Sequence, residues 1–378
     1  MRVYQIAKPN NIHKFLTDLE LDKSGVEIIK TKMELIYIKI EDLKTPAVNI
    51  LKQDALSIGA ELAVPSGVIL CQKDRYDCLL IGTKRQLERL SKKELAQPFG
   101  LKEVAKTINN IINTKEYPIE IMGILNANSD SFYSGSRFIG DNAIAQINKL
   151  IEDGADIIDI GAVSSRPGST AISYTEELNR VKDILKTIKD KKLYKKVDFS
   201  IDSYTPEVVE VALDSGFKYI NDITGAKDNR LIELAVKYNA KYIIMHMQGT
   251  PKDMQENPTY ECVVTEVEEF FKQQIKKCEM LGLKKENIIL DVGIGFGKTL
   301  EHNLALLKSH KHFQKLGCQL LIGASRKSLI DKIIPTPIEQ RLAGTLAIHL
   351  KAIDNGASIV RCHDVAEHKQ AIKIWQEI

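Results

Sequence analysis

A single carboxylate followed by a fan of glycines is the feature of this sequence that most suggests chemistry. Asp291 comes directly after the apolar run 288–290, and glycines stand at positions 293, 295 and 297. The run is short enough to be a buried strand, and the glycines let the backbone turn or approach a ligand closely. Asp291 therefore lies at a strand's carboxyl end, where it binds a ligand or caps the next helix. The segment is not a Walker A loop, because Val292 stands where that motif needs glycine.

Other polar residues also follow short apolar segments in the last two-thirds of the chain. They are Asn126, Arg166, Asp202, Asn221, Lys327, Arg361 and His363. Carboxylates and carboxamides together can bind the N–H and amino edge of a heterocycle, while Arg361 and His363 alternate along one strand and suit phosphate oxygens. Asn126 could complete the shell of a Mg²⁺ ion that also binds water and phosphate. Each residue alone also has a structural interpretation, as a cap, a turn residue or a packed side chain, and their shared position favours a site.

Eight units of strand followed by helix would position these residues. The expected strands are 119–125, 155–160, 197–201, 218–220, 241–245, 288–290, 320–324 and 358–360, and amphipathic segments at 143–153, 176–189, 206–215, 263–281 and 340–355 alternate with them. Strands this apolar are typical of a parallel sheet that helices cover on both faces. Eight units predict a (β/α)₈ TIM barrel with its active site at the carboxyl ends of the strands. An open doubly wound sheet is the alternative.

Residues 1–115 have a different pattern, which predicts a small α/β domain before the barrel domain of residues 116–378. Segment 34–40 alternates like a strand, 67–71 is a short apolar run expected to be buried, and 83–95 is an amphipathic helix. No strand tips with polar residues occur here, so we expect this extension to lack catalytic residues. Cys71 and Cys78 are too far apart in sequence for a simple metal pair, and we expect two packed thiols.

Composition excludes several classes of protein. The chain has 378 residues, 44% of them hydrophobic, with 53 basic and 50 acidic residues. This near balance gives no reason to expect a nucleic-acid or membrane surface. Neither a transmembrane run nor a signal peptide is visible, so we expect a cytoplasmic protein whose six cysteines are reduced. The histidines at 302, 310 and 312 lack the spacing of a metal motif, and we expect them to be solvated.

The segments at the strand tips resemble those of dihydropteroate synthases. The resemblance covers residues 119 to 375 and rests on 122–132, 159–168, 200–203, 220–222, 245–251, 291–298, 323–328 and 360–363. It implies a transferase of folate biosynthesis that joins dihydropterin-6-ylmethyl diphosphate to 4-aminobenzoate and releases diphosphate. It also implies Mg²⁺ as cofactor, a homodimer, and sulfonamides as inhibitors.

The resemblance also assigns roles to individual residues. It places the pterin against Asp202, Asn221, Met247, Asp291, Phe296 and Lys327. It places the diphosphate against Asn126, Arg361 and His363, with Asn126 on the metal, and 4-aminobenzoate against Ser165, Arg166, Pro167 and Ser328. The residues implied in catalysis are Asp202, Lys327, Arg361, His363 and Arg166. These roles make physical sense, because a leaving diphosphate needs cations and a developing pterin-methyl cation needs a nearby carboxylate such as Asp202.

The sequence departs from the family pattern in two loops. Asn128-Ser129 replaces a usual Thr-Pro in the first loop, and Val163 opens the second loop in place of a usual glutamate. Loss of the proline frees φ, so we expect the first loop to become ordered only when substrate arrives.

Two other functions stay open: a pterin-binding methyltransferase acting on a methyl-folate, and a pterin-binding protein without catalysis. The methyltransferase gives no reason for Lys327 or for the pair Arg361 and His363, because no diphosphate leaves in that reaction.

Overall fold

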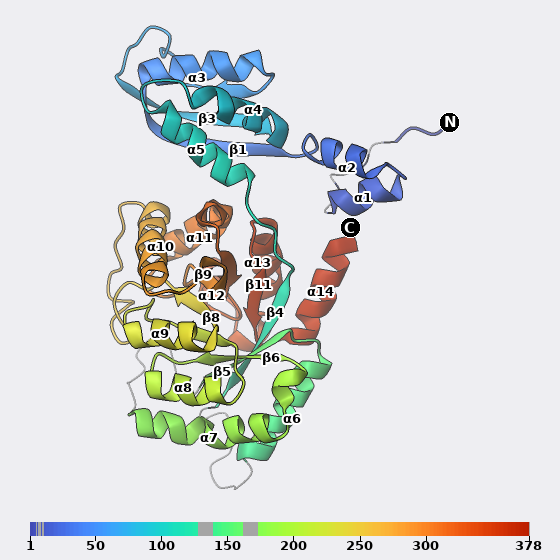
Figure 1. Ribbon diagram of the computed structural model, residues 1–378, viewed down its shortest axis with the longest axis vertical. Helices are drawn as coiled ribbons and strands as arrows, with labels where there is room; N and C mark the ends of the chain where they lie inside the picture. The colour runs from blue at the N-terminus through green and yellow to red at the C-terminus, as the bar shows by residue number, and fades with distance from the viewer. Residues whose placement is uncertain (5, 7–8, 10, 128–138, 162–172, 378) are drawn as a thin grey trace. The chain divides into compact units, whose positions relative to one another are not determined.

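The computed structural model describes residues 1–127, 139–161 and 173–377, apart from residues 5, 7, 8 and 10. The chain divides into two compact units, and Figure 1 draws residues 1–115 of the first unit in blue to teal. The first unit comprises Met1–Lys115 with the last residues from Ile374, and the second comprises Glu116–Lys373.

The second unit is a closed barrel of eight parallel strands, which confirms the predicted fold. Around the barrel the order is β10-β11-β4-β5-β6-β7-β8-β9. The strands are β4 (Glu120–Asn126), β5 (Ile157–Gly161), β6 (Asp198–Asp202), β7 (Tyr219–Asp222), β8 (Lys241–Met245), β9 (Ile288–Asp291), β10 (Gln319–Ile322) and β11 (Ile359–Cys362). Each contains or overlaps one of the eight segments expected to be strands. Pairing of β11 with β4 closes the barrel and rules out the open sheet.

Buried side chains from seven strands fill the interior of the barrel. They are Met122, Ile157, Tyr219, Ile243, Ile289, Leu321 and Ile359. Inward and outward residues alternate along each strand, so apolar side chains fill the inside while others pack against the helices. The polar residues of the interior follow closer to the carboxyl ends of the strands.

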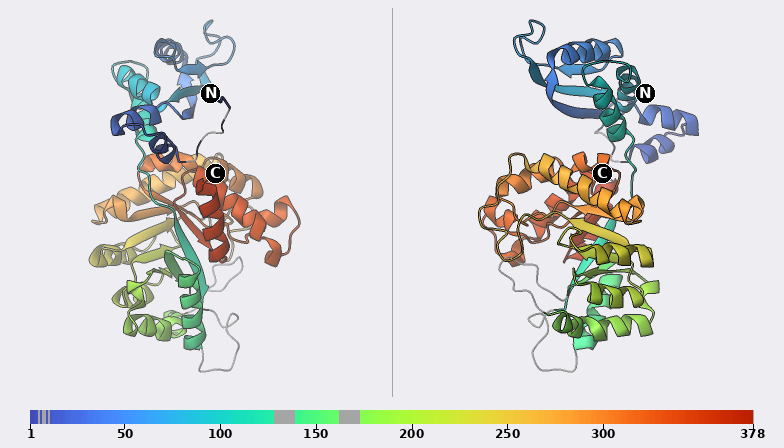
Figure 2. Two further views of the ribbon diagram at one scale, coloured as in Figure 1. Left: turned by 90° about the vertical axis from the view of Figure 1, so that its right-hand side faces the viewer. Right: turned by 60° about the vertical axis from the view of Figure 1, so that its left-hand side comes forward.

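Helices surround the strands on the outside, as Figure 2 shows from two further sides. They are α6 (Ile139–Glu152), α7 (Tyr174–Asp190), α8 (Pro206–Asp214), α9 (Asn229–Tyr238), α10 (Val263–Met280), α11 (Leu300–Lys308), α12 (Ser328–Ile333), α13 (Leu342–Asp354) and α14 (Val365–Glu377). Four short 3₁₀ helices connect them: η1 (Leu193–Lys195), η2 (Lys285–Asn287), η3 (His310–Leu316) and η4 (Ile338–Gln340). No helix among the described residues is long and apolar enough to cross a membrane.

The first unit contains a three-stranded antiparallel sheet with helices. The sheet order is β1-β3-β2, and the elements are α1 (Ile12–Asp18), α2 (Lys23–Lys30), β1 (Leu35–Lys44), α3 (Thr45–Ser57), β2 (Glu61–Ala63), β3 (Arg75–Thr83), α4 (Lys84–Glu94) and α5 (Leu101–Ile112). Leucines of α3, α4 and the sheet form its core. Thr83 and Gln86 cap each other at the start of α4, which explains why the predicted helix begins there.

Three expectations from the sequence are wrong. Residues 67–71 are not a buried run, since only Val68 is buried; they form consecutive turns, in which Gly67 has a φ of +86° and its carbonyl accepts the N–H of Leu70. Cys71 in these turns is exposed and only Cys78 is buried, so the two thiols are not packed together. His310 is not solvated but fully buried against Phe313. All six cysteines are free, as expected for reduced thiols.

Candidate active site

Arg361 joins the carboxyl ends of three strands inside the barrel. From β11, its Nε donates to Asp159 Oδ2 of β5 at 2.6 Å, and its Nη2 donates to Asp202 Oδ2 of β6 at 2.7 Å. Asn221 of β7 donates from Nδ2 to the same oxygen of Asp159 at 2.9 Å. The structure thus brings together three residues predicted to bind the pterin or the diphosphate.

Asp159 at the centre of this network was missed by the sequence analysis. Its side chain is completely buried, and it lies inside β5 rather than at the tip. The signal available in the sequence was a carboxylate between two isoleucines of an expected strand, since an unpaired buried charge is too costly to keep. In the structure Asp159 pairs with Arg361 and also accepts a hydrogen bond from Asn221, so it holds both side chains in place.

Burial and opposite charges set the protonation of this network. Burial raises the pKa of Asp202 to about 7, although Arg361 opposes the change; Asp159 adds to it by repulsion. Burial alone would lower the pKa of Arg361, but Asp159 and Asp202 raise it above its ordinary value. The guanidinium therefore stays charged, while Asp202 can hold or release a proton near neutral pH.

Asp291, at the end of β9, and Lys327, in the turn between β10 and α12, form a second charged group. Lys327 Nζ donates to the carbonyl of Ile294 and lies 4.5 Å from the centre of the Phe296 ring. Burial lowers the pKa of Lys327 to about 8, and Asp291 opposes this. Burial also raises the pKa of Asp291, and the N–H of Gly293 donates to its Oδ1 at 2.8 Å. Three residues predicted to bind pterin therefore share this edge of the barrel.

The glycines after Asp291 are needed for close approach to the loop that follows β8. Gly293 has a φ of +67°, and a Cβ there would lie 2.1 Å from the carbonyl oxygen of His246. Lys298 also contacts His246: its buried Nζ lies 3.0 Å from His246 Nδ1 and 3.1 Å from the His246 carbonyl oxygen. Burial lowers the pKa of Lys298 to about 7. This lysine holds the loop in place, unlike a Walker A lysine, which projects toward phosphate.

The remaining predicted residues lie apart from these hydrogen bonds or outside the described residues. Asn126 ends β4 and is half-buried, and Met247 is half-buried after β8. His363 is exposed, with its Nδ1 2.9 Å from Ser325 Oγ, and Ser328 is exposed at the start of α12. Ser165, Arg166 and Pro167, and the altered residues Asn128 and Ser129, lie outside the described residues.

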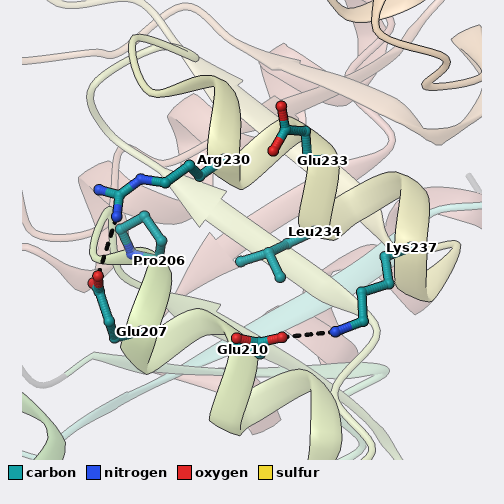
Figure 3. Close-up of a pocket in the computed structure, with 7 residues that line it drawn as sticks. All are labelled: Pro206, Glu207, Glu210, Arg230, Glu233, Leu234 and Lys237. Carbon is teal, nitrogen blue, oxygen red and sulfur yellow. Dashed lines mark hydrogen bonds and ion pairs between the residues drawn. The ribbon is translucent and has the colours of Figure 1, made fainter.

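A shallow hollow of about 280 Å³ lies on the outside of the barrel between α8 and α9 (Figure 3). Four of its charged side chains form two ion pairs, Arg230 with Glu207 at 3.1 Å and Lys237 with Glu210 at 2.7 Å. None of the predicted site residues lines it. The candidate active site is therefore the interior end of the strands and not this groove.

Comparison with known proteins places the chain in a family. The signature of the pterin-binding enzyme family matches residues 122–363, a range that contains every predicted site residue. The chain belongs to the pterin-binding enzymes. Among these, its relatives are dihydropteroate synthases, as the sequence resemblance indicated.

The most informative relatives differ in how much of the chain they match. A bifunctional dihydropteroate synthase/dihydropteroate reductase of Helicobacter pylori is 41% identical over 98% of this chain and 97% of its own length. The dihydropteroate synthase of Haemophilus influenzae is also 41% identical, over 68% of this chain and 93% of its own. The structure of the Yersinia pestis dihydropteroate synthase with a sulfonamide drug has 35% identity and a TM-score of 0.64, covering 68% of this chain and 94% of that chain.

Proposed function

We propose that this protein joins dihydropterin-6-ylmethyl diphosphate to 4-aminobenzoate, giving dihydropteroate and diphosphate. The observation that carries the proposal is the pair of charged groups at the strand ends, Arg361 with Asp159 and Asp202, and Lys327 with Asp291. The carboxylates, with the neighbouring amide of Asn221, offer acceptors and donors for a heterocycle, and Arg361 and Lys327 offer fixed cations. The named relatives carry the same activity.

The reaction needs little acid–base help from the protein. The amine of 4-aminobenzoate supplies an electron pair to the pterin methylene carbon, the carbon–oxygen bond to diphosphate breaks, and the amine then loses a proton. An aniline is already a nucleophile near neutral pH, so rate comes from positioning and from stabilising the leaving group. Asp159 and Asp202 hold Nε and Nη2 of Arg361, whereas Nη1 donates to none of the described residues and can bind a phosphate oxygen. Asp202, at the end of β6, is the carboxylate that would stabilise positive charge developing on the pterin side.

We further propose Mg²⁺ as the cofactor, with Asn126 as the protein ligand. Asn126 ends β4, the strand that pairs with β11. Its carboxamide oxygen is a ligand type that Mg²⁺ accepts, and its position at the end of this strand suits an ion that also binds the diphosphate. When bound, the ion would neutralise charge on the leaving diphosphate. The described residues contain no group of three His, Cys, Asp or Glu side chains arranged for a metal. A site built from one amide, water and substrate is the kind that Mg²⁺ commonly takes.

Three finer proposals follow from the same resemblance. We propose a cytoplasmic location, which six free thiols support, and a homodimer, which sedimentation at several concentrations tests. We also propose that sulfonamides compete with 4-aminobenzoate, as expected of a relative of the Y. pestis enzyme solved with such a drug.

Turnover with defined substrates tests the main proposal. The purified protein is supplied with the pterin diphosphate, 4-aminobenzoate and Mg²⁺, and both diphosphate and dihydropteroate are measured. Equal amounts of the two products are expected. Methyl transfer from a methyl-folate to a corrinoid would support the methyltransferase instead, and pterin binding without any product would support a non-catalytic protein.

A second activity is favoured by the H. pylori relative, which matches almost the whole chain and is named as a reductase as well. The H. influenzae enzyme covers 68% of this chain, whereas the bifunctional relative also spans the extension. We propose that the first unit contributes to reduction of the dihydropteroate product, which takes one hydride and one proton. A reduced nicotinamide or flavin is the class of donor required. Oxidation of the donor by full-length protein, but not by a chain beginning at Glu116, is expected when dihydropteroate is supplied.

A further inference from the structure

Two buried histidines outside the predicted site hold the turn that carries Lys327. The turn connects β10 to α12 and contains Ala324, Ser325 and Arg326 before Lys327. The backbone N–H of Ala324 donates to His349 Nε2 of α13 at 3.0 Å. His349 Nδ1 lies 2.8 Å from His368 Nε2 of α14, and His368 Nδ1 lies 2.6 Å from the carbonyl oxygen of Asp364. Both rings are 1% exposed.

The direction of every hydrogen bond in this chain is fixed by its first donor. A backbone N–H can only donate, so Nε2 of His349 must accept and its proton lies on Nδ1. That proton is donated to His368 Nε2, and the remaining proton of His368 is donated to the Asp364 carbonyl. Each ring is therefore neutral and in a single tautomer. This agrees with burial, which lowers the pKa of both histidines, that of His349 well below its ordinary value.

The chain of hydrogen bonds connects the two strand tips that carry the predicted catalytic cations. It starts in the turn before Lys327 and ends at Asp364, next to His363 on the tip of β11. The Asp364 carboxylate also binds Arg326, accepting from Nε at 3.0 Å. Side chains of α13 and α14 thus hold both tips at once.

The turn needs such support because its backbone is strained. Arg326 has a φ of +56°, a left-handed conformation that residues with a Cβ adopt at a cost. Its N–H donates to Thr345 Oγ1 at 2.9 Å, one helical turn before His349 on α13. Two side chains of one helix face therefore accept two N–H groups of the turn, those of Ala324 and Arg326, which lie on either side of Ser325.

We propose that His349 and His368 are positioning residues for the reaction at Lys327. They do not touch substrate but fix the backbone from which Lys327 reaches the carbonyl of Ile294 and the ring of Phe296. A shift of about 1 Å in a positioned group can lower a rate about 10²-fold. Loss of the hydrogen bonds should therefore act on both pterin binding and turnover. The inference rests on the proposed function, since it assigns a supporting role to residues of that site.

Substitutions of similar volume separate hydrogen bonding from packing. His349→Gln keeps an acceptor for Ala324 N–H and a donor for His368, whereas His349→Leu fills the space without either. We expect His349→Leu to lower kcat/KM for the pterin diphosphate about 10- to 100-fold, and His349→Gln to stay within about threefold of wild type. His310→Leu serves as control, because His310 is equally buried on η3 but packs against Phe313; its kcat/KM should not change.

The second histidine provides an independent comparison. His368→Leu should lower kcat/KM as much as His349→Leu does, whereas His368→Gln should keep kcat/KM close to the wild-type value. In the double Leu variant kcat/KM should fall at most about twofold below that of either single variant, because both substitutions break the same chain of hydrogen bonds. If His349→Leu fails to fold, the His368 pair decides. Equal kcat/KM for Leu and Gln variants, or reduced melting temperature with unchanged kcat/KM, would overturn the inference.

Hydrogen exchange separates this inference from the proposed reaction. In wild-type protein the amides of Ala324 and Arg326 should exchange slowly, and His349→Leu should speed exchange of residues 323–328 while His349→Gln does not. This measurement needs no turnover. Wild-type protein that makes no dihydropteroate would refute the proposed function, whereas unchanged exchange in His349→Leu would refute the positioning role.

Discussion

Replacing Asp291 with Asn tests the assignment of the pterin site most directly. Asp291 is 6% exposed at the end of β9, and its Oδ1 accepts the N–H of Gly293 at 2.8 Å. An Asn side chain keeps this acceptor, so the local fold should survive. The negative charge is lost, and with it the interaction that raises the pKa of Lys327. At pH 7.5 more of Lys327 should then be neutral, which weakens the site further.

The size of the effect follows from the number of acceptors. A carboxylate can accept from two ring donors of the pterin, and hydrogen bonds to a charged group contribute about 1.5–3 kcal/mol each. Asn offers one neutral acceptor, which contributes about 1 kcal/mol. The expected loss is about 2–5 kcal/mol, which corresponds to a rise in Kd of roughly 30- to 5,000-fold.

Calorimetric titration with a pterin analogue measures this loss. Asp198→Asn is the matched control, because Asp198 lies at the opposite, amino end of β6 and pairs with Lys218 at 2.6 Å. That variant should bind the analogue like wild type. A folded Asp291→Asn protein whose Kd stays within about threefold of wild type would show that Asp291 does not bind the pterin.

Three further outcomes are expected. A chain beginning at Glu116 should remain soluble and make dihydropteroate, and a soluble barrel without turnover would place catalytic residues in the extension. Calorimetry should show that 4-aminobenzoate binds tightly only when diphosphate and Mg²⁺ are present, and equal affinity without the anion would mean a preformed pocket. In the same site, Arg166→Ala should lower turnover about 10²-fold. Burial alone would raise the pKa of Glu268, but hydrogen bonds from His312 and Lys315 hold it well below its ordinary value. Because the folded pKa is depressed, this stability is present above the unfolded value of about 4.3 and lost as pH falls. Urea unfolding should therefore show Glu268→Gln about 2 kcal/mol less stable at pH 7, with the difference shrinking steadily as pH falls below the unfolded pKa.

The barrel could be predicted because its signal is local and repeated. Each strand is a short apolar run followed by a polar tip and an amphipathic helix, and eight repeats leave few folds that bury them all. Residues 67–71 show the limit of such patterns. Their apolar side chains suggested burial, but Gly67 begins consecutive turns and leaves Ile69 and Leu70 mostly exposed. An apolar run alone does not say whether other residues will cover it.

The sequence by itself determined which residues lie at the strand ends, since alternation and strand length place Asp202, Asn221, Asp291 and Lys327 there without any distant contact. Only the tertiary structure decided how they are held. Asp159 meets Arg361 across 202 positions of sequence, a pairing that exists because β11 closes the barrel beside β4, with β5 next in order. His349 and His368 meet because two outer helices pack beside one strand. Such contacts depend on which strands become neighbours, and no periodicity in the sequence encodes the partner of a single buried charge or ring.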